Sequence, residues 1–146
     1  MLMNSNEPKT WRIEHSIETT ASPAALWAIW SDVPGWAKWN AGIASIELEG
    51  PFADGTWFAT KPPGEEAFRS KLLEVRANES FVDETRVGDL VVTVMHRIER
   101  LGPERTRVIY AVFAEGPDAD QIGPAISADF PEVLAGLVAL ATGAAK

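Results

Sequence analysis

The sequence has 146 residues, of which 46% are hydrophobic, a size and composition typical of one folded domain. Its net charge of −8, from 21 acidic and 13 basic residues, argues against nucleic acid and anionic membrane surfaces as partners. The chain contains no cysteine, so disulfides, thiolate metal sites and cysteine nucleophiles are excluded.

The first ten residues are expected to form a flexible tail, followed by one domain over residues 11–146. The segment Met1–Lys9 is polar and has no apolar core of the kind that signal peptides carry. No apolar run approaches the roughly 20 residues needed to span a bilayer. We therefore expect a cytoplasmic protein without membrane insertion.

The first predicted element is a half-buried strand from Trp11 to Glu18. Apolar residues and His15 alternate there with charged residues and a serine, which is the period of a strand with one buried face. Ser22 is a residue type preferred at a helix N-cap, and Pro23 is preferred at the first helical position. A helix is therefore expected from Pro23 to Trp30.

After the turn at residues 31–35, a second short helix is expected to carry Trp36 and Trp39. Six strands then follow in quick succession, separated by turn signals rich in glycine, proline and aspartate. Because the loops are short, consecutive strands should be antiparallel neighbours. The six predicted strands are Ala44–Glu49, Thr56–Thr60, Arg69–Arg76, Phe81–Arg86, Leu90–Arg100 and Thr106–Glu115.

The last stretch, residues 117–146, is predicted to be a long amphipathic helix, which Pro131 should kink or break. Its apolar residues recur at three- and four-residue steps. They are Ile122, Ile126, Phe130, Val133, Leu134, Leu137 and Leu140. One long apolar face must be buried against the sheet, which makes the fold class α+β with helices on one face of an antiparallel sheet.

The order of one strand, two short helices, a six-strand meander and a long C-terminal helix resembles the helix-grip fold of the SRPBCC superfamily. That superfamily includes START domains, the birch-pollen-allergen family and the polyketide cyclase/dehydrase group, to which this sequence is most similar. The segments that carry the resemblance are Ser22–Trp27, Asp32–Asn40, Gly55–Phe58, His96–Glu99 and Thr106–Val108. The resemblance implies a curved seven-stranded sheet wrapped around the long helix, with an apolar cavity between them.

Candidate chemistry lies in the hairpin between Leu90 and Glu115. If charged side chains face water, alternation turns His96 and Tyr110 inward. A five-residue connection then sets His96 opposite Tyr110, and Glu99 opposite Arg107 on the outer face. A slip of one residue would turn a whole face over, so the pattern constrains this register tightly.

His15 also lies on the apolar face of its strand. In the helix-grip sheet the first strand neighbours the last, so the resemblance places His15 near Tyr110 and His96. A histidine beside a phenol in an apolar pocket could act as general acid or base. The plainer alternative is a core histidine bonded to a hydroxyl or carbonyl group. Two histidines supply too few ligands for zinc, and neither a metal nor a cofactor is expected.

The candidate ligand-binding residues occupy inward positions of the strands and helices. They are His15, Trp36, Trp39, Trp57, Val94, His96, Tyr110, Val112, Phe130 and Leu134. Further polar candidates are Asn40 and Arg69, whereas the carboxylates Asp83 and Glu84 are expected to be solvated charges at a strand edge. Trp57 and Phe58 are adjacent on a strand, so only one of them can face the interior.

Trp36 and Trp39 lie three residues apart, so they project from adjoining faces of their helix. One would anchor the helix to the sheet, and the other could close the cavity mouth against an aromatic ligand. The alternative is that both belong to the core.

Three hypotheses for function follow. The first is binding of a small hydrophobic, aromatic or polyketide- or lipid-like ligand between sheet and C-terminal helix. The second is a cyclase or dehydratase in the same cavity, with His96 and Tyr110 as catalytic candidates. The third is a protein-interaction module without a ligand, which would have a filled core and an exposed apolar patch. A monomer and a dimer are both compatible with the sequence.

Overall fold

A computed structural model describes residues 9–143, which form seven strands and four helical segments. The strands are β1 (Thr10–Thr19), β2 (Ser45–Leu48), β3 (Trp57–Lys61), β4 (Phe68–Arg76), β5 (Ser80–Val87), β6 (Leu90–Gly102) and β7 (Arg105–Glu115). The helices are α1 (Pro23–Ser31), the 3-10 helix η2 (Val33–Lys38), α2 (Ala119–Ser127) and α3 (Phe130–Ala141). The tail predicted over residues 1–10 lies outside the described residues, except for its last two positions.

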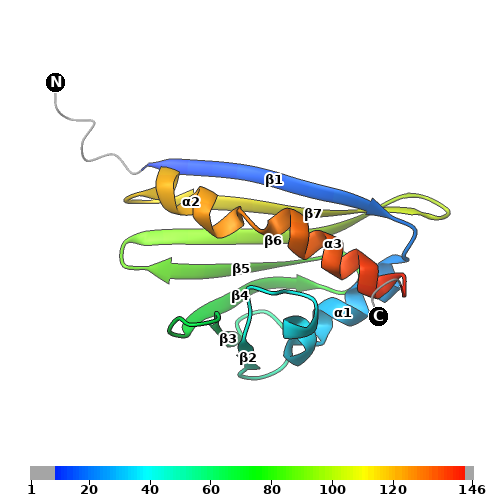
Figure 1. The fold of residues 1–146 in the computed structure, drawn as a ribbon, viewed down its shortest axis with the longest axis horizontal. Coiled ribbons are helices and arrows are strands. Elements are labelled where there is room, and N and C mark those ends of the chain that lie inside the picture. Colours follow the sequence, from blue (N-terminus) through cyan, green and yellow to red (C-terminus); the bar gives the residue numbers. More distant parts are fainter. Residues whose placement is uncertain (1–8, 144–146) are drawn as a thin grey trace.

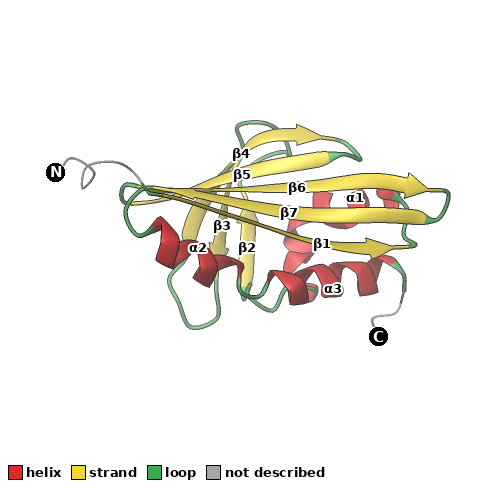
Figure 2. Cartoon of the chain, turned by 90° about the horizontal axis from the view of Figure 1, so that it is seen from above, coloured by secondary structure: helices red, strands yellow, loops and turns green. Residues whose placement is uncertain are grey.

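The strands form one antiparallel sheet in the order β1-β7-β6-β5-β4-β3-β2. The sheet is curved, and α2 and α3 run along β1 and β7 on its inner face (Figures 1 and 2). The α+β helix-grip architecture with two short helices after β1 is therefore confirmed. The first and last strands are neighbours, as the resemblance implied.

The helix α1 begins where the sequence predicts. The Ser22 hydroxyl accepts a hydrogen bond from the Ala25 backbone N–H at 3.1 Å, and Pro23 occupies the first turn. This N-cap satisfies one of the amides that a helix start leaves without an intrahelical partner. The helix then delivers Leu26 and Trp30 to the core, where both side chains are fully buried.

The C-terminal helix is present as two pieces. Ala128 and Asp129 are not helical, and Pro131 lies in the first turn of α3, where its missing N–H costs no hydrogen bond. The helix is therefore interrupted just before Pro131, as predicted. The apolar face of α3 reaches the core through Val133, Leu134 and Leu137.

The segment Ala119–Ala141 is 23 residues long and apolar enough to cross a membrane by length and composition alone. This corrects the expectation that no apolar stretch of the chain approaches that length. Mostly buried core helices of folded domains meet the same criterion, and 22% of the most apolar 18 residues of this segment are buried. Here the buried face is the one that packs against the sheet, and the break before Phe130 divides the segment.

The register of β6 and β7 matches the prediction, with His96 opposite Tyr110 and Glu99 opposite Arg107. The connection between the strands is shorter than the predicted five residues, because β6 continues to Gly102 and β7 begins at Arg105. A register shift between Arg100 and Gly102 takes up the difference. Such a bulge inserts a residue at the end of a ladder without changing the pairing further along it.

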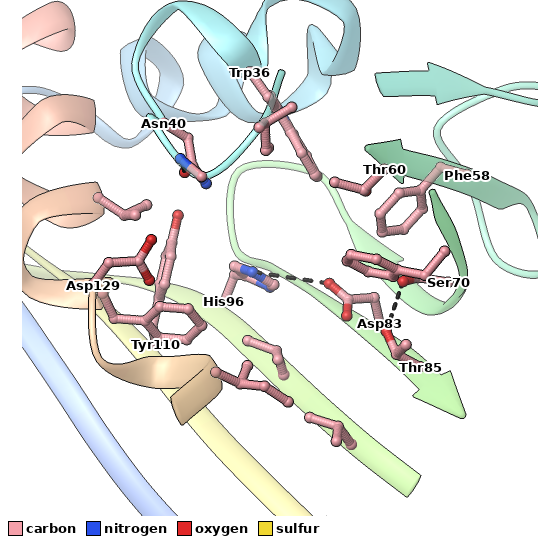
Figure 3. Close-up of a pocket in the computed structure, with 18 of the residues that line it drawn as sticks. Trp36, Asn40, Phe58, Thr60, Ser70, Asp83, Thr85, His96, Tyr110 and Asp129 are labelled. Carbon is pink, nitrogen blue, oxygen red and sulfur yellow. Dashed lines mark hydrogen bonds and ion pairs between the residues drawn. The ribbon is translucent and has the colours of Figure 1, made fainter. Parts of the chain in front are cut away.

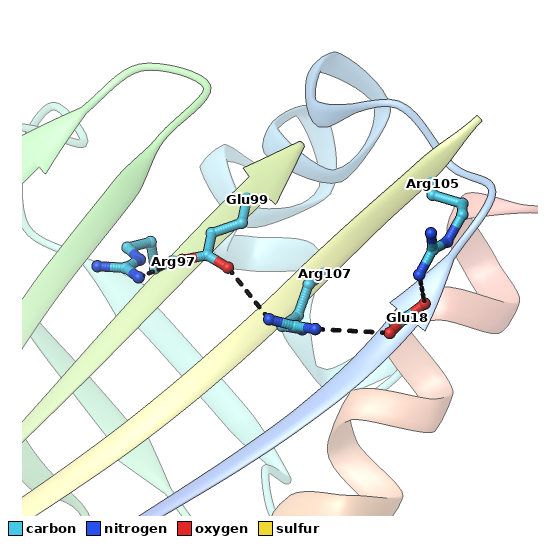
Figure 4. A network of polar contacts seen from close by, with 5 residues as sticks. All are labelled: Glu18, Arg97, Glu99, Arg105 and Arg107. Carbon is cyan, nitrogen blue, oxygen red and sulfur yellow. Dashed lines mark hydrogen bonds and ion pairs between the residues drawn. The ribbon is translucent and has the colours of Figure 1, made fainter. Parts of the chain in front are cut away.

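Charged side chains on the outer face of β1, β7 and β6 form a continuous network (Figure 4). The Arg107 guanidinium contacts Glu99 at 3.5 Å and Glu18 at 3.6 Å, and Arg105 contacts Glu18 at 2.9 Å. Arg97 adds a further contact to Glu99. The hydrogen bond from Arg105 holds the pKa of Glu18 below its ordinary value. The network confirms that this face is the outer one and that His96 and Tyr110 point the other way.

Candidate functional site

A cavity of about 460 Å³ lies between the inner face of the sheet and the helices. Its walls come from η2 and the loop after it, from β3 to β7, and from α2 and α3. Most lining residues are apolar or aromatic, and Trp36, Phe58 and Phe81 are almost fully buried. Small-molecule sites usually have this composition, with a few polar groups that fix the orientation of a ligand.

The mouth of the cavity is apolar as well. Phe68 on β4, Val87 on β5 and Ile126 on α2 line it and remain 41%, 55% and 36% exposed. These three side chains come from opposite sides of the opening, since β4 and β5 belong to the sheet and α2 to the helical layer. A hydrophobic molecule that enters the cavity would therefore already contact apolar side chains at the mouth.

Six of the ten predicted ligand-binding residues line this cavity: Trp36, Trp39, Val94, His96, Tyr110 and Phe130. Trp36 also anchors η2, because its indole N–H donates a hydrogen bond to the Trp30 carbonyl at 2.9 Å. Its ring also packs on Phe58 of β3 and Phe81 of β5, so Trp36 is the tryptophan that anchors the helix to the sheet. Trp39 lies just beyond η2, and its ring packs 6.4 Å from that of Trp36.

The other four predicted residues do not line the cavity. His15 is directly opposite Tyr110 in the ladder, but the ring of Phe130 packs edge-on to it at 6.3 Å. Val112 and Leu134 are fully buried in the packed core, where α2 and α3 cover β1 and β7. The helices α2 and α3 thus cover most of β1 and β7, and the open space lies over β3 to β6 and reaches β7 at Tyr110.

Trp57 faces outward, and Phe58 takes the interior position. Trp57 is 38% exposed, whereas Phe58 is 4% exposed and lines the cavity. The Arg69 guanidinium lies 4.7 Å from the Trp57 ring and pairs with Glu49, so Arg69 is also on the outer face. The suggestion that Arg69 supplies a polar group to the cavity is therefore wrong. Lys71 approaches the same ring at 5.8 Å, and these cations cover the exposed indole.

His96 has a defined orientation at the floor of the cavity. Its Nδ1 lies 3.2 Å from the Phe81 carbonyl oxygen, and its ring stacks on the Phe81 ring with centroids 3.9 Å apart. A carbonyl oxygen only accepts, so Nδ1 carries the proton and Nε2 carries the lone pair. Burial lowers the pKa of His96 to about 3. The hydrogen bond to the Phe81 carbonyl raises this pKa, but by less than burial lowers it. The imidazole is therefore neutral at physiological pH.

Asp83 is the residue that the sequence interpretation misplaced. Its carboxylate is buried rather than solvated, and Oδ2 lies 3.9 Å from Nε2 of His96 (Figure 3). Burial raises the pKa of Asp83 from 3.8 to about 7. The signal in the sequence was its parity on β5, since Asp83 shares a face with Phe81 and Thr85.

Tyr110 lies on the other side of His96, with ring centroids 4.5 Å apart. The Trp30 indole N–H donates a hydrogen bond to the Tyr110 hydroxyl oxygen at 3.2 Å. Burial raises the pKa of Tyr110, so the phenol keeps its proton. Because the oxygen accepts from Trp30, the hydroxyl hydrogen is free to donate to another group.

Further polar groups complete the lining. The hydroxyls of Ser70 and Thr85 bond to each other at 2.6 Å, next to Asp83 (Figure 3). Asn40, which the sequence suggested as a polar candidate, does line the cavity, and its Oδ1 accepts from the Gly42 N–H at 2.9 Å. Asp129 adds a second carboxylate at the start of α3, across the cavity from Asp83.

The arrangement provides both directions of proton transfer. His96 offers an unprotonated nitrogen, Tyr110 offers a hydroxyl donor, and the pKa of Asp83, about 7, allows both of its forms near neutral pH. Within residues 9–143, no three His, Asp or Glu side chains converge as a metal site would require. The site therefore combines proton donors and acceptors with an apolar cavity.

Residues 10–142 match the model of a protein family described as polyketide cyclase / dehydrase and lipid transport. No curated protein matches the sequence significantly. Several solved structures share the fold. The Zhui aromatase/cyclase from Streptomyces sp. R1128 has a TM-score of 0.78 and 14% identity, over 92% of this chain and 94% of that one.

Norcoclaurine synthase from Thalictrum flavum, solved with dopamine and hydroxybenzaldehyde, has a TM-score of 0.74 and 17% identity. The match covers 98% of this chain and 92% of that one. A START superfamily protein from Mycobacterium smegmatis has a TM-score of 0.67 and 18% identity, over 87% and 96% of the two chains. At these identities the likenesses concern the fold alone, and they agree with the helix-grip arrangement of sheet and helices.

Proposed function

We propose that this chain, which belongs to the polyketide cyclase / dehydrase and lipid transport family, binds a small hydrophobic molecule in the cavity between sheet and helices. The observation that carries the proposal is the cavity of about 460 Å³ with its apolar walls and apolar mouth. Its size falls within the range of roughly 300–1,000 Å³ that small-molecule sites occupy. A protein-interaction module would instead be expected to have a filled core.

The ligand is proposed to be aromatic, polyketide-like or lipid-like. Aromatic rings make up much of the wall, and several already pack edge to face: Trp36 against Phe58 at 5.8 Å and Tyr110 against Phe130 at 5.5 Å. A planar ligand would extend such contacts, which add roughly 0.5–1.5 kcal/mol each beyond the area that they bury.

A cyclase or dehydratase activity is the second candidate, supported by Asp83, His96 and Tyr110 at the cavity floor. In an aldol closure, the ionised Asp83 carboxylate, whose pKa of about 7 suits a base near neutral pH, would take a proton from the carbon next to a substrate carbonyl, and the resulting enolate would attack a second carbonyl carbon. The Tyr110 hydroxyl would donate a proton to the alkoxide oxygen that forms, and the proton on Asp83 would return to Tyr110. His96, whose pKa is about 3, is too weak a base for the first step. This sequence balances without a cofactor.

Native mass spectrometry of the freshly purified protein, followed by organic extraction, tests the binding proposal. A discrete adduct of aromatic or acyl mass is expected, and the extracted molecule is then titrated back by tryptophan fluorescence. Val94→Phe fills the cavity wall and should weaken binding at least tenfold. Val91→Phe adds the same atoms to the opposite face of β6 and serves as the control.

The two candidates are separated by Tyr110→Phe, which keeps the ring and removes the hydroxyl that would donate a proton. A binding protein keeps most of its affinity for the extracted ligand, whereas an enzyme loses turnover while binding is kept. If no adduct appears and a panel of apolar ligands leaves tryptophan fluorescence unchanged, the ligand-binding proposal is contradicted.

A further inference from the structure

We propose that the cavity selects hydrophobic ligands that carry a protonated amine over matched alcohols and carboxylates, with Asp83 and His96 together binding the ammonium group. The inference rests on the proposed ligand-binding function and adds the charge class of the ligand. Three observations support it: the charged residues of the lining are acidic, Asp83 and His96 have acceptor atoms without a donor, and the chain has a negative net charge.

The charged side chains that line the cavity are acidic. Asp83 and Asp129 belong to the wall, and no described lysine or arginine does. The arginines next to lining residues in the sequence, Arg69, Arg86 and Arg97, are exposed and pair with glutamates on the outer face. A ligand carboxylate would therefore meet two carboxyl groups without a compensating cation, whereas an ammonium group would meet complementary charge.

Asp83 lacks a hydrogen-bond donor. The residue is 8% exposed, and no donor within residues 9–143 bonds to its carboxylate. The nearest polar atom is Nε2 of His96 at 3.9 Å, too far for a hydrogen bond. The carboxylate oxygens of Asp83 face the cavity space, since the one fully buried side-chain polar atom without a partner in residues 9–143 is Nε1 of Trp39, a donor elsewhere in the wall. A ligand group that supplies a donor to Asp83 would therefore be bound favourably.

Asp83 and His96 together present two acceptors to the same space. The proton of His96 is held at Nδ1 by the Phe81 carbonyl, so Nε2 faces Asp83 with a lone pair. An ammonium group has three donors and no acceptor, and one placed beside both atoms would satisfy each of them. A ketone or carboxylate oxygen would leave Nε2 without a donor, and an alcohol has only one hydrogen to give.

The net charge of the chain acts in the same direction. The whole chain carries a net charge of −8, which raises the local concentration of cationic ligands at a negatively lined cleft.

Isothermal titration calorimetry with three ligands of one skeleton tests the inference: 2-naphthylmethylamine, 2-naphthylmethanol and 2-naphthoate at pH 8. The amine is expected to bind at least tenfold more tightly than the alcohol, and the carboxylate most weakly. Asp83→Asn should reduce the affinity for the amine to that for the alcohol and leave the alcohol unchanged. Glu84→Gln removes one negative charge from the neighbouring position of β5, which faces away from the cavity, and should preserve the preference.

A second measurement does not depend on the stability of any variant. Protonation of Asp83 removes the counter-charge, so the ratio of amine to alcohol affinity in the unmodified protein should fall at least fivefold from pH 8 to pH 5.5. The other titratable groups that line the cavity are Asp129, His96 and Tyr110. A ratio that stays constant from pH 8 to pH 5.5 would overturn the inference.

Equal binding of amine and alcohol would overturn the inference and leave the proposed function standing. Tightest binding of the carboxylate would also overturn it. Binding of none of the three would overturn it as well, and the proposed function would then be decided separately by the adduct seen in native mass spectrometry.

Discussion

Oδ2 of Asp83 lies 3.9 Å from Nε2 of His96 across the β5–β6 ladder, and burial shifts the pKa values of the two groups in opposite directions. The folded protein therefore keeps a proton on the carboxyl and none on the imidazole in mildly acidic solution. The unfolded chain holds its proton on the imidazole instead. Between about pH 4 and pH 6.5 the two contributions to the pH dependence of stability largely cancel.

Replacing Asp83 should leave only the contribution of His96 to the pH dependence of stability. The pKa of Asp83 is raised from 3.8 to about 7 on folding, so the carboxyl ionises first in the unfolded chain and destabilises the fold as pH rises through that window. Asp83→Asn should gain stability relative to the unmodified protein from pH 4 to pH 7, by about 4 kcal/mol at the upper end. Urea denaturation at four pH values measures the gain, and a constant difference across the series would contradict the prediction.

Replacing His96 should give the opposite slope. Burial lowers the pKa of His96 from 6.5 to about 3, so the unfolded chain takes up the proton first as pH falls. His96→Gln should therefore gain stability relative to the unmodified protein below pH 6.5, by roughly 1.4 kcal/mol for each pH unit, on top of a constant loss of packing. The same denaturation series measures this slope. A gain that grows with rising pH would contradict the assignment of a neutral buried imidazole.

The hydrogen bond between Trp30 and Tyr110 can be tested by removing one oxygen. Tyr110→Phe leaves the buried Trp30 indole N–H without its acceptor while it keeps the ring. A loss of about 1–3 kcal/mol in the free energy of unfolding is expected, because an unsatisfied buried donor pays its full desolvation cost. Chemical denaturation measures the loss, and an unchanged or higher stability would show that this bond is not maintained.

The inward position of Phe58 predicts a large difference between neighbouring aromatic residues. Phe58→Ala should cost about 3–5 kcal/mol, because it removes a buried ring that packs on Trp36. Trp57→Ala should cost much less, because that indole lies on the outer face and is 38% exposed. Thermal denaturation of the two variants checks the order, and the reverse order would place Trp57 in the interior.

Much of the fold was predictable from local patterns. Alternation along β6 and β7 assigned the inward faces, and the length of their connection set His96 opposite Tyr110, because only one register keeps both charged sets outside. The break near Pro131 was predictable because proline cannot donate the bond that would continue a helix. These features depend on residues close together in the chain.

The positions around the cavity depend on long-range packing instead. His15 and Val112 face inward as their patterns require, but α2 and α3 cover them, and Leu134 of α3 packs into the same core. No local pattern predicts where the helices cross the sheet. Asp83 shares the inward face of β5 with Phe81, yet its burial beside His96 follows only once β5 pairs with β6 and the helices close over them. Alternation decides which side of a strand is inside, whereas the assembled layers decide whether that inside is packed core or open cavity.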